Sequence, residues 1–339
     1  MGKPKSTPLV SIIIPTYNSQ NTIKQCLESI SQQNYKKIEI LVVDRYSKDA
    51  TVQIVKQFKA TVFPFKGERS KAKNYAAKKA NGEFLLFIDS DMQLNPKIVE
   101  ECVSECIESA AHAVIIPEES VSLGLIGEQR KTEKKILSNL NELMELPRFF
   151  VKEVFLKLGG FDEKLVCGED FQFFQKFTAA GYKVGKIKSK ILHFEDIPST
   201  YHVFVKAYNY GKTLPNLIEK AARKAVERYA VIRLTSIQKI GVYVKNLKSL
   251  SVFSLIKGIE FLGYFLGICV GVTGRWFNKE NLRKMTAGIN EKRNMLMTGA
   301  FFTLIALIIF KNFLFTNDIP AGNDIFGWIS REYIFARNY

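Results

Sequence analysis

The sequence predicts an α/β protein with a doubly wound, mostly parallel sheet, followed by basic amphipathic helices and a C-terminal transmembrane helix. Three observations support this prediction. Apolar runs typical of buried strands alternate with helical patterns through the first 199 residues. Basic side chains then outnumber acidic ones by 17 to 5 over residues 200–294. Finally, residues 294–310 carry no charge and are long enough to cross most of a bilayer.

Strands and helices are expected to alternate along the first part of the chain. Runs of β-branched and apolar residues predict strands, and apolar residues three or four positions apart predict helices. The expected strands are 10–15, 39–43, 61–64, 83–88 and 113–116, with a further strand-like run at 184–192. The expected helices are 21–33, 50–58, 70–80 and 95–109, and the third of them meets Asn81-Gly82, a typical helix stop.

Polar and acidic residues directly follow three of these strands, at positions 16–18, 44–49 and 89–91. In an open parallel sheet, ligands bind in the crevice beyond the carboxyl ends of the strands. The sequence therefore predicts a binding site at this edge of the sheet.

Asp89-Ser90-Asp91 is the first candidate for chemistry at that edge. The motif follows the apolar strand FLLFI, so both carboxylates leave the sheet together. Carboxylate oxygens suit Mg²⁺ or Mn²⁺, which keep coordination positions open for phosphate oxygens. A solvated turn that caps a helix is the alternative for so short a motif.

Glu169 and Asp170 form a second pair of carboxylates, at the start of a helical pattern after the turn 166–168. The positive end of the helix dipole favours the charged form of both groups. Considered alone, the pair is explained by the preference of a helix N-terminus for acidic residues. A catalytic role for it requires support from the surrounding sequence.

Five segments resemble, in order and spacing, the family 2 inverting glycosyltransferases of the GT-A fold. They are VSIIIPTYN (10–18), LVVDRYSKDAT (41–51), GERSKAKNYAAKKANGEFLLFIDSDM (67–92), GGFDEKLVCGEDFQF (159–173) and ILHFED (191–196). The resemblance covers about residues 8–200. It implies a GT-A fold and the transfer of a hexose from a nucleotide-diphosphate sugar with inversion at the anomeric carbon.

The resemblance also implies which residues bind the donor, namely Pro15, Thr16, Tyr17, Asp44, Arg69 and Asp89. The first four would contact the nucleotide base, and the last two would face the diphosphate. Arg45 and Tyr46 depart from the family pattern of a second acid and a glycine, so both UDP-sugars and GDP-sugars remain open. A solvated basic face is the alternative for Arg69 and its neighbours Lys71 and Lys73.

The resemblance further implies the metal ligands and the base. Asp91, Asp89 and His193 would hold Mg²⁺ or Mn²⁺, and a packing histidine is the alternative for His193. Asp170 would be the general base that takes the proton from the acceptor hydroxyl, supported by Glu169. Phe149 and Phe150 are consistent either with an acceptor-side wall or with core residues.

Charge divides the chain into four expected parts. Residues 1–199 are nearly neutral and would form the GT-A domain, and residues 200–294 would be a basic, helical, membrane-interface segment. Residues 295–315 would span the membrane and residues 316–339 would form an extracytoplasmic tail. Basic residues before the span predict a protein of the cell membrane with a cytoplasmic catalytic domain. A second apolar stretch, 252–273, is interrupted by charges, which favours an interfacial helix over a tilted second span.

The expected reaction is metal-dependent sugar transfer to a hydroxyl on a membrane-lipid-linked acceptor. A hydroxyl needs a base such as Asp170, whereas a phosphate is already largely ionised at neutral pH. A polyprenyl- or dolichyl-phosphate glycosyl synthase is the first alternative. A non-enzymatic nucleic-acid-binding protein is the second, since the net charge is +16. The basic surplus adjoins a membrane segment rather than a recognition motif, so no nucleic acid partner is expected.

Overall fold

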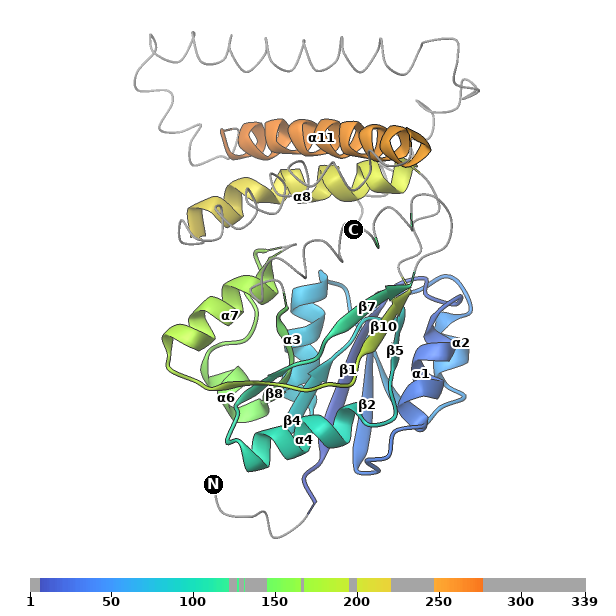
Figure 1. Ribbon diagram of the computed structural model, residues 1–339, viewed down its shortest axis with the longest axis vertical. Coiled ribbons are helices and arrows are strands. Elements are labelled where there is room, and N and C mark those ends of the chain that lie inside the picture. Colours follow the sequence, from blue (N-terminus) through green and yellow to red (C-terminus); the bar gives the residue numbers. More distant parts are fainter. Residues whose placement is uncertain are drawn as a thin grey trace. The chain divides into compact units, whose positions relative to one another are not determined.

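The computed structural model has the α/β architecture that the sequence predicts (Figure 1). It describes residues 7–121, 145–165, 168–194, 200–220 and 247–276, together with residues 127 and 131. Within these residues the strands form two sheets. The larger has seven strands, which are in spatial order β3 (Ala60–Pro64), β2 (Ile38–Asp44), β1 (Val10–Thr16), β4 (Phe84–Phe87), β8 (Pro147–Val151), β6 (Ala113–Ile115) and β9 (Val184–Lys186). The smaller has three, which are β5 (Met92–Leu94), β10 (Ile191–Phe194) and β7 (Glu118–Val121).

Most strand pairs in the larger sheet are parallel, as predicted. β1 pairs in parallel with both β2 and β4, and β2 with β3. β8 alone runs antiparallel to its neighbours β4 and β6. Every strand predicted between residues 10 and 116 is present. β5, β7 and β8, which have charged or polar residues among their three to five positions, were not predicted.

The strand-like run 184–192 is not one strand, and that prediction was wrong. β9 belongs to the larger sheet and β10 to the smaller, with a turn between them. Glu101, on α4 (Ile98–Glu108), accepts hydrogen bonds from the backbone N–H of Lys188 at 3.3 Å and of Ser189 at 3.0 Å. It also accepts one from the Ser189 hydroxyl at 2.6 Å. These three bonds hold the turn that separates the strands.

Helices cover both faces of the larger sheet. Those predicted before residue 110 are present as α1 (Ile23–Ser31), α2 (Thr51–Val55), α3 (Arg69–Lys79) and α4, with α2 shorter than predicted. One core packs α1 and α4 against the sheet, and the other packs α3, α6 (Lys152–Lys157) and α7 (Glu169–Ala179) against the opposite face. Alternate residues of β1 enter opposite cores, Ile12 and Ile14 the first and Ile13 the second.

Phe149 and Phe150 are core residues. Both are buried, and as successive positions on β8 they enter opposite cores. Of the two interpretations that the sequence allowed, the structure therefore supports the core and not an acceptor-side wall.

The loop before α7 is fastened to α3. Asn74 donates through Nδ2 to the Phe161 carbonyl at 2.8 Å and accepts from the Phe161 N–H at 3.0 Å. The Ser70 hydroxyl donates to the Leu165 carbonyl at 3.1 Å. Gly160 has a φ of +67°, and a Cβ there would lie 2.5 Å from Asn74 Oδ1, so only glycine fits. This anchoring places Glu169, the first residue of α7, relative to α3.

Two compact units divide the chain, and the larger sheet lies in the first. The second includes residues 207–215 of α8 (Thr200–Lys220) and residues 262–276 of α11 (Leu247–Trp276). Within it, the two helix backbones meet at glycines. A Cβ on Gly211 would lie 2.3 Å from the Tyr264 carbonyl oxygen, and one on Gly267 would lie 2.1 Å from that of Tyr208. Glycine permits this close packing because it has no side chain.

Among the described residues, the segment Phe253–Val272 of α11 has the length and apolar composition needed to cross a membrane. It lies in the stretch that the sequence favours as an interfacial helix, and the structure makes it part of one continuous helix. The predicted transmembrane helix at 295–315 and the tail at 316–339 lie outside the described residues. The predicted boundaries of the four parts remain predictions.

Candidate active site

Three adjacent strands of the larger sheet end at the site. Parallel pairing of β1 and β2 puts Thr16 opposite Asp44, and the Thr16 hydroxyl donates to Asp44 Oδ1 at 3.1 Å. β4, on the other side of β1, ends two residues before Asp89. The polar ends of these strands therefore meet at one edge of the sheet, as predicted.

The smaller sheet brings Asp91 and His193 together. β5 begins directly after Asp91, and its antiparallel pairing with β10 puts His193 opposite Met92. The Phe194 N–H also donates to the Asp91 carbonyl at 2.9 Å. As a result, His193 Nε2 lies 3.4 Å from Asp91 Oδ2. Two predicted metal ligands that are far apart in the sequence thus face each other.

Asp89, the third predicted ligand, contacts two arginines. Arg69 Nη1 lies 3.5 Å from Asp89 Oδ1, and Arg148 Nη1 lies 3.7 Å from Asp89 Oδ2. Burial by itself would raise the pKa of Asp89, but the positive charges of Arg69, Lys73 and Arg148 outweigh it and hold that pKa well below its usual range. Asp89 is therefore a carboxylate at neutral pH.

Glu118 and Arg148 belong to this cluster, and the sequence analysis missed both. The Arg148 guanidinium donates through Nε to Glu118 Oε1, and Glu118 Oε2 lies 3.4 Å from His193 Nδ1. Glu118 is the first residue of β7 and Arg148 the second of β8, two strands that were not predicted. A charged residue beside the apolar pair at 149 and 150 was the available signal for Arg148.

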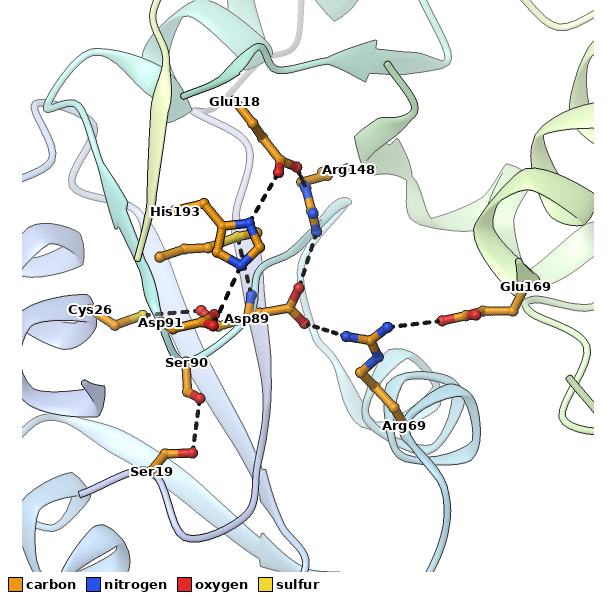
Figure 2. Close-up of polar contacts among 11 residues, drawn as sticks. Ser19, Cys26, Arg69, Asp89, Ser90, Asp91, Glu118, Arg148, Glu169 and His193 are labelled. Carbon is orange, nitrogen blue, oxygen red and sulfur yellow. Dashed lines mark hydrogen bonds and ion pairs between the residues drawn. The ribbon is translucent and has the colours of Figure 1, made fainter. Parts of the chain in front are cut away.

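The contacts form one continuous chain of alternating charge, which Figure 2 shows. It runs through Asp91, His193, Glu118, Arg148, Asp89, Arg69 and Glu169. Burial would lower the pKa of His193, but its contacts with Asp91 and Glu118 raise it to about 9. Burial would raise the pKa of Glu118, but Arg148 and His193 lower it to about 2. Each charge in the chain thus has an opposite charge beside it.

Glu169 and Asp170 have different surroundings although they are adjacent. Glu169 is buried, and its Oε1 lies 3.9 Å from Arg69 Nη2. Burial raises the pKa of Glu169 above its usual value. Asp170 is exposed, and its Oδ1 accepts a hydrogen bond from the Phe171 N–H at 2.8 Å. Of the pair, Asp170 is the carboxylate that an incoming molecule can reach from solvent.

The basic residues of α3 divide between the site and solvent. Arg69 and Lys73 are one helical turn apart and both act on Asp89, whereas Lys71 is exposed. Lys73 is buried, and burial lowers the pKa of its amine. A solvated basic face therefore describes Lys71 but neither Arg69 nor Lys73.

Among the residues predicted to contact the nucleotide base, Asp44 is buried and Tyr17 is exposed. Asp44 is buried and accepts hydrogen bonds from the Ser47 hydroxyl and, at 2.9 Å, from the Ser47 N–H, so it stabilises its own turn. Tyr17 is exposed, and the Arg45 guanidinium carbon lies 5.9 Å from the centre of its ring. Pro15 is half-buried beneath this surface. Tyr17 and Arg45 thus offer a face on which a planar base can lie.

The donor set suits a divalent cation only in part. Asp91 and His193 supply an oxygen and an imidazole nitrogen that face each other, which fits Mn²⁺ or Mg²⁺ with further oxygens from a diphosphate. Asp89 is instead paired with two arginines. Within the described part of the chain, no three His, Cys, Asp or Glu residues are gathered as a complete metal site. Asp91 and His193 are therefore the residues that would hold the metal.

Comparisons with known proteins agree with this architecture. Residues 11–150 match the model of glycosyl transferase family 2. The chain is 33% identical over 121 residues to poly(ribitol-phosphate) beta-N-acetylglucosaminyltransferase TarS of Staphylococcus aureus, which is 33% of this chain and 21% of TarS. It is 28% identical over 193 residues to glycosyltransferase AglE of Haloferax volcanii, which is 52% of this chain and 64% of AglE. The chain thus spans less than two thirds of the length of either relative.

Among solved structures, one with a similar fold shows the extent of the likeness. It is the mannosyltransferase PcManGT from Pyrobaculum calidifontis in complex with GDP-Man and Mn²⁺, with a TM-score of 0.50 and 18% identity. The likeness covers 82% of this chain and 92% of that chain. The protein therefore has a GT-A-like fold. The segment that resembles glycosyl transferase family 2 carries both Asp89 and Asp91.

Proposed function

We propose that the chain is an inverting glycosyltransferase that moves a sugar from a UDP- or GDP-sugar to a hydroxyl on a lipid-linked acceptor at a membrane. The observation that carries this proposal is the charged chain from Asp91 to Glu169, at the carboxyl edge of a family 2 domain. It combines carboxylates and cations, and the exposed carboxylate of Asp170 follows Glu169 directly, so the groups needed to hold a diphosphate and to activate an acceptor lie together.

The donor diphosphate would lie against Arg69, whose guanidinium is half-exposed. Asp89 and Glu169 hold that guanidinium from two sides, so it needs little reorganisation when the donor binds. A divalent metal on Asp91 and His193 would neutralise charge on the departing diphosphate. GDP-Man and Mn²⁺ in PcManGT support a donor and a metal of these kinds.

Asp170 is the proposed general base. It is exposed at the start of α7, and the neighbouring Glu169 is buried against Arg69. Proton transfer requires a carboxylate within reach of the acceptor hydroxyl, and the exposure of Asp170 supports this role while Glu169 holds the arginine. Asp170 would thus act on the acceptor, and Glu169 would act on the donor through Arg69.

A lipid-linked acceptor is supported by the segment after residue 199. That segment carries the basic surplus, and it contains the apolar helix Phe253–Val272. Basic side chains attract anionic lipid surfaces, and an apolar helix of this length enters them. A cytoplasmic domain at the cell membrane follows as part of the proposal.

The experiment is a transfer assay with membranes that contain the full chain and a panel of radiolabelled UDP- and GDP-sugars. The Asp170→Asn variant is expected to lower kcat by ~10²–10⁴, because the base is lost, while donor binding is kept. Glu153→Gln is the matched control, since Glu153 is an exposed acid in the first turn of α6 and lies outside the charged chain.

Two outcomes would change the proposal. If Asp170→Asn transfers sugar at the wild-type rate, the acceptor is a phosphate, which needs little base, and the enzyme is a polyprenyl- or dolichyl-phosphate glycosyl synthase. If no nucleotide-sugar in the panel is consumed by the wild-type chain, the proposed activity is wrong.

A further inference from the structure

Glu118 connects the two sheets within the site. It begins β7 in the smaller sheet, and it pairs with Arg148, which stands on β8 in the larger sheet. The carboxylate uses its two oxygens separately, with Oε1 on Arg148 and Oε2 at 3.4 Å from His193 Nδ1. Figure 2 shows Glu118 on the opposite side of the imidazole from Asp91.

This arrangement determines what each ring nitrogen can do. A neutral imidazole carries a proton on one nitrogen and a lone pair on the other, and a carboxylate beside one nitrogen keeps the proton there. Glu118 lies at Nδ1 and Asp91 Oδ2 lies 3.4 Å from Nε2, so Nε2 is the nitrogen that would give up its proton to a metal while the Nδ1 proton stays beside Glu118. Histidines that bind metals usually have such a carboxylate on the other ring nitrogen.

We propose that Glu118 is a positioning residue that holds His193 with Nε2 turned toward Asp91 and thereby sets the affinity of the site for a divalent metal. Arg148 completes the arrangement, because it occupies Oε1 and leaves Oε2 for the histidine. The inference rests on the proposed function, in which Asp91 and His193 hold the metal, and it adds a residue that no sequence motif marks.

The chain provides a matched control in the next residue. Glu119 follows Glu118 on β7, so its side chain points to the opposite face of the strand. It is exposed, and its Oε2 lies 3.6 Å from Lys190 Nζ, away from the charged chain. A change at Glu119 removes the same charge from the same strand without touching His193.

The experiment measures the affinity of the purified full chain for Mn²⁺ by electron paramagnetic resonance, with Mn²⁺ alone and with added UDP or GDP. Glu118→Ala is expected to weaken Mn²⁺ binding by ~10- to 100-fold, the usual effect of losing such a partner. Glu118→Gln is expected to fall between, because it keeps an oxygen that can lie beside Nδ1 but loses the negative charge. Glu119→Gln is expected to match the wild type.

Thermal unfolding of the metal-free variants separates positioning from folding. If Glu118→Ala lowers the metal-free Tm, Glu118→Gln carries the test, and its weaker Mn²⁺ binding at an unchanged Tm supports the inference. The inference is overturned if both Glu118 variants bind Mn²⁺ as the wild type does while Asp91→Asn loses it, a result that leaves the proposed function intact. If the wild type binds no Mn²⁺ under any of the three conditions, the metal part of the proposed function falls as well.

Discussion

Arg69 is the residue that would link the proposed donor side of the site to the proposed acceptor side. Its guanidinium contacts Asp89 at 3.5 Å and Glu169 at 3.9 Å, and it is the half-exposed cation of the charged chain. The two carboxylates fix the direction of a long side chain that would otherwise lose rotamer freedom on binding. In the proposed function, a diphosphate would therefore meet a cation already in place.

Replacing Arg69 by Gln is expected to raise the KM for the nucleotide-sugar by ~10- to 100-fold, because a hydrogen bond to a charged group contributes about 1.5–3 kcal/mol. Steady-state kinetics with varied donor measure the change. Lys71→Gln removes a charge two positions along the same helix, where the side chain is exposed, and should leave KM unaltered. An equal rise in both variants would mean that α3 attracts the donor only through its summed charge.

Glu39 joins three elements at the end of the sheet opposite the site. It stands on β2 and accepts hydrogen bonds from the Ser11 hydroxyl of β1 and from the N–H groups of Asn81 and Gly82 before β4. Burial would raise the pKa of Glu39, but these hydrogen bonds outweigh it and lower that pKa below the ordinary value of 4.5. Since the folded-state pKa is depressed, the stabilisation is complete above the unfolded pKa and is lost as the pH falls through the folded one.

Glu39→Gln is accordingly expected to lower the free energy of unfolding by about 1 kcal/mol at pH 7 and by less at pH 3, where the wild-type carboxyl is also neutral. Urea unfolding at the two pH values gives both differences. Glu28→Gln, an exposed acid of α1 that lies 3.9 Å from Lys24, is the control and should change little. If Glu39→Gln lowers the free energy of unfolding by the same amount at both pH values, the charge of Glu39 is not the source of the stabilisation.

At the scale of the whole molecule, the basic surplus and the apolar helix α11 both lie after residue 199. Residues 1–199 are nearly neutral, whereas residues 200–294 carry a net +12 and include the continuous helix α11. Two segments are candidates for membrane insertion, namely Phe253–Val272 and the predicted span at 295–315. The first lies before residue 294 and the second after it, so a chain truncated at residue 294 keeps only the first.

A chain that ends at residue 294 is expected to leave the membrane fraction in alkaline carbonate, because it lacks the predicted span and keeps only an interfacial helix with basic residues. Western blotting of the supernatant and the pellet, with the full chain as reference, measures the release. Retention of the shortened chain in the pellet would identify Phe253–Val272 as a membrane-spanning helix.

Local sequence determined the larger elements and the edge at which they place their polar residues. The β-branched run of β1 and the apolar run of β4 specify buried parallel strands, and Asp89 and Asp91 follow from their position after β4. The family motifs added Glu169, Asp170 and His193. These features could be predicted because each depends on residues that are neighbours in the sequence.

Tertiary structure alone decided how these residues are connected. Glu118 and Arg148 stand on short strands, and they meet His193 and Asp89 only because β7 pairs with β10 and β8 pairs with β4. The same applies to Phe150. The sequence allowed it to be either an acceptor-side wall or a core residue, and the pairing of β8 with β4 places it in the core. Pairing between strands distant in sequence depends on packing of the whole sheet, and a short strand with charged residues, such as β7, carries no local pattern that identifies its partner.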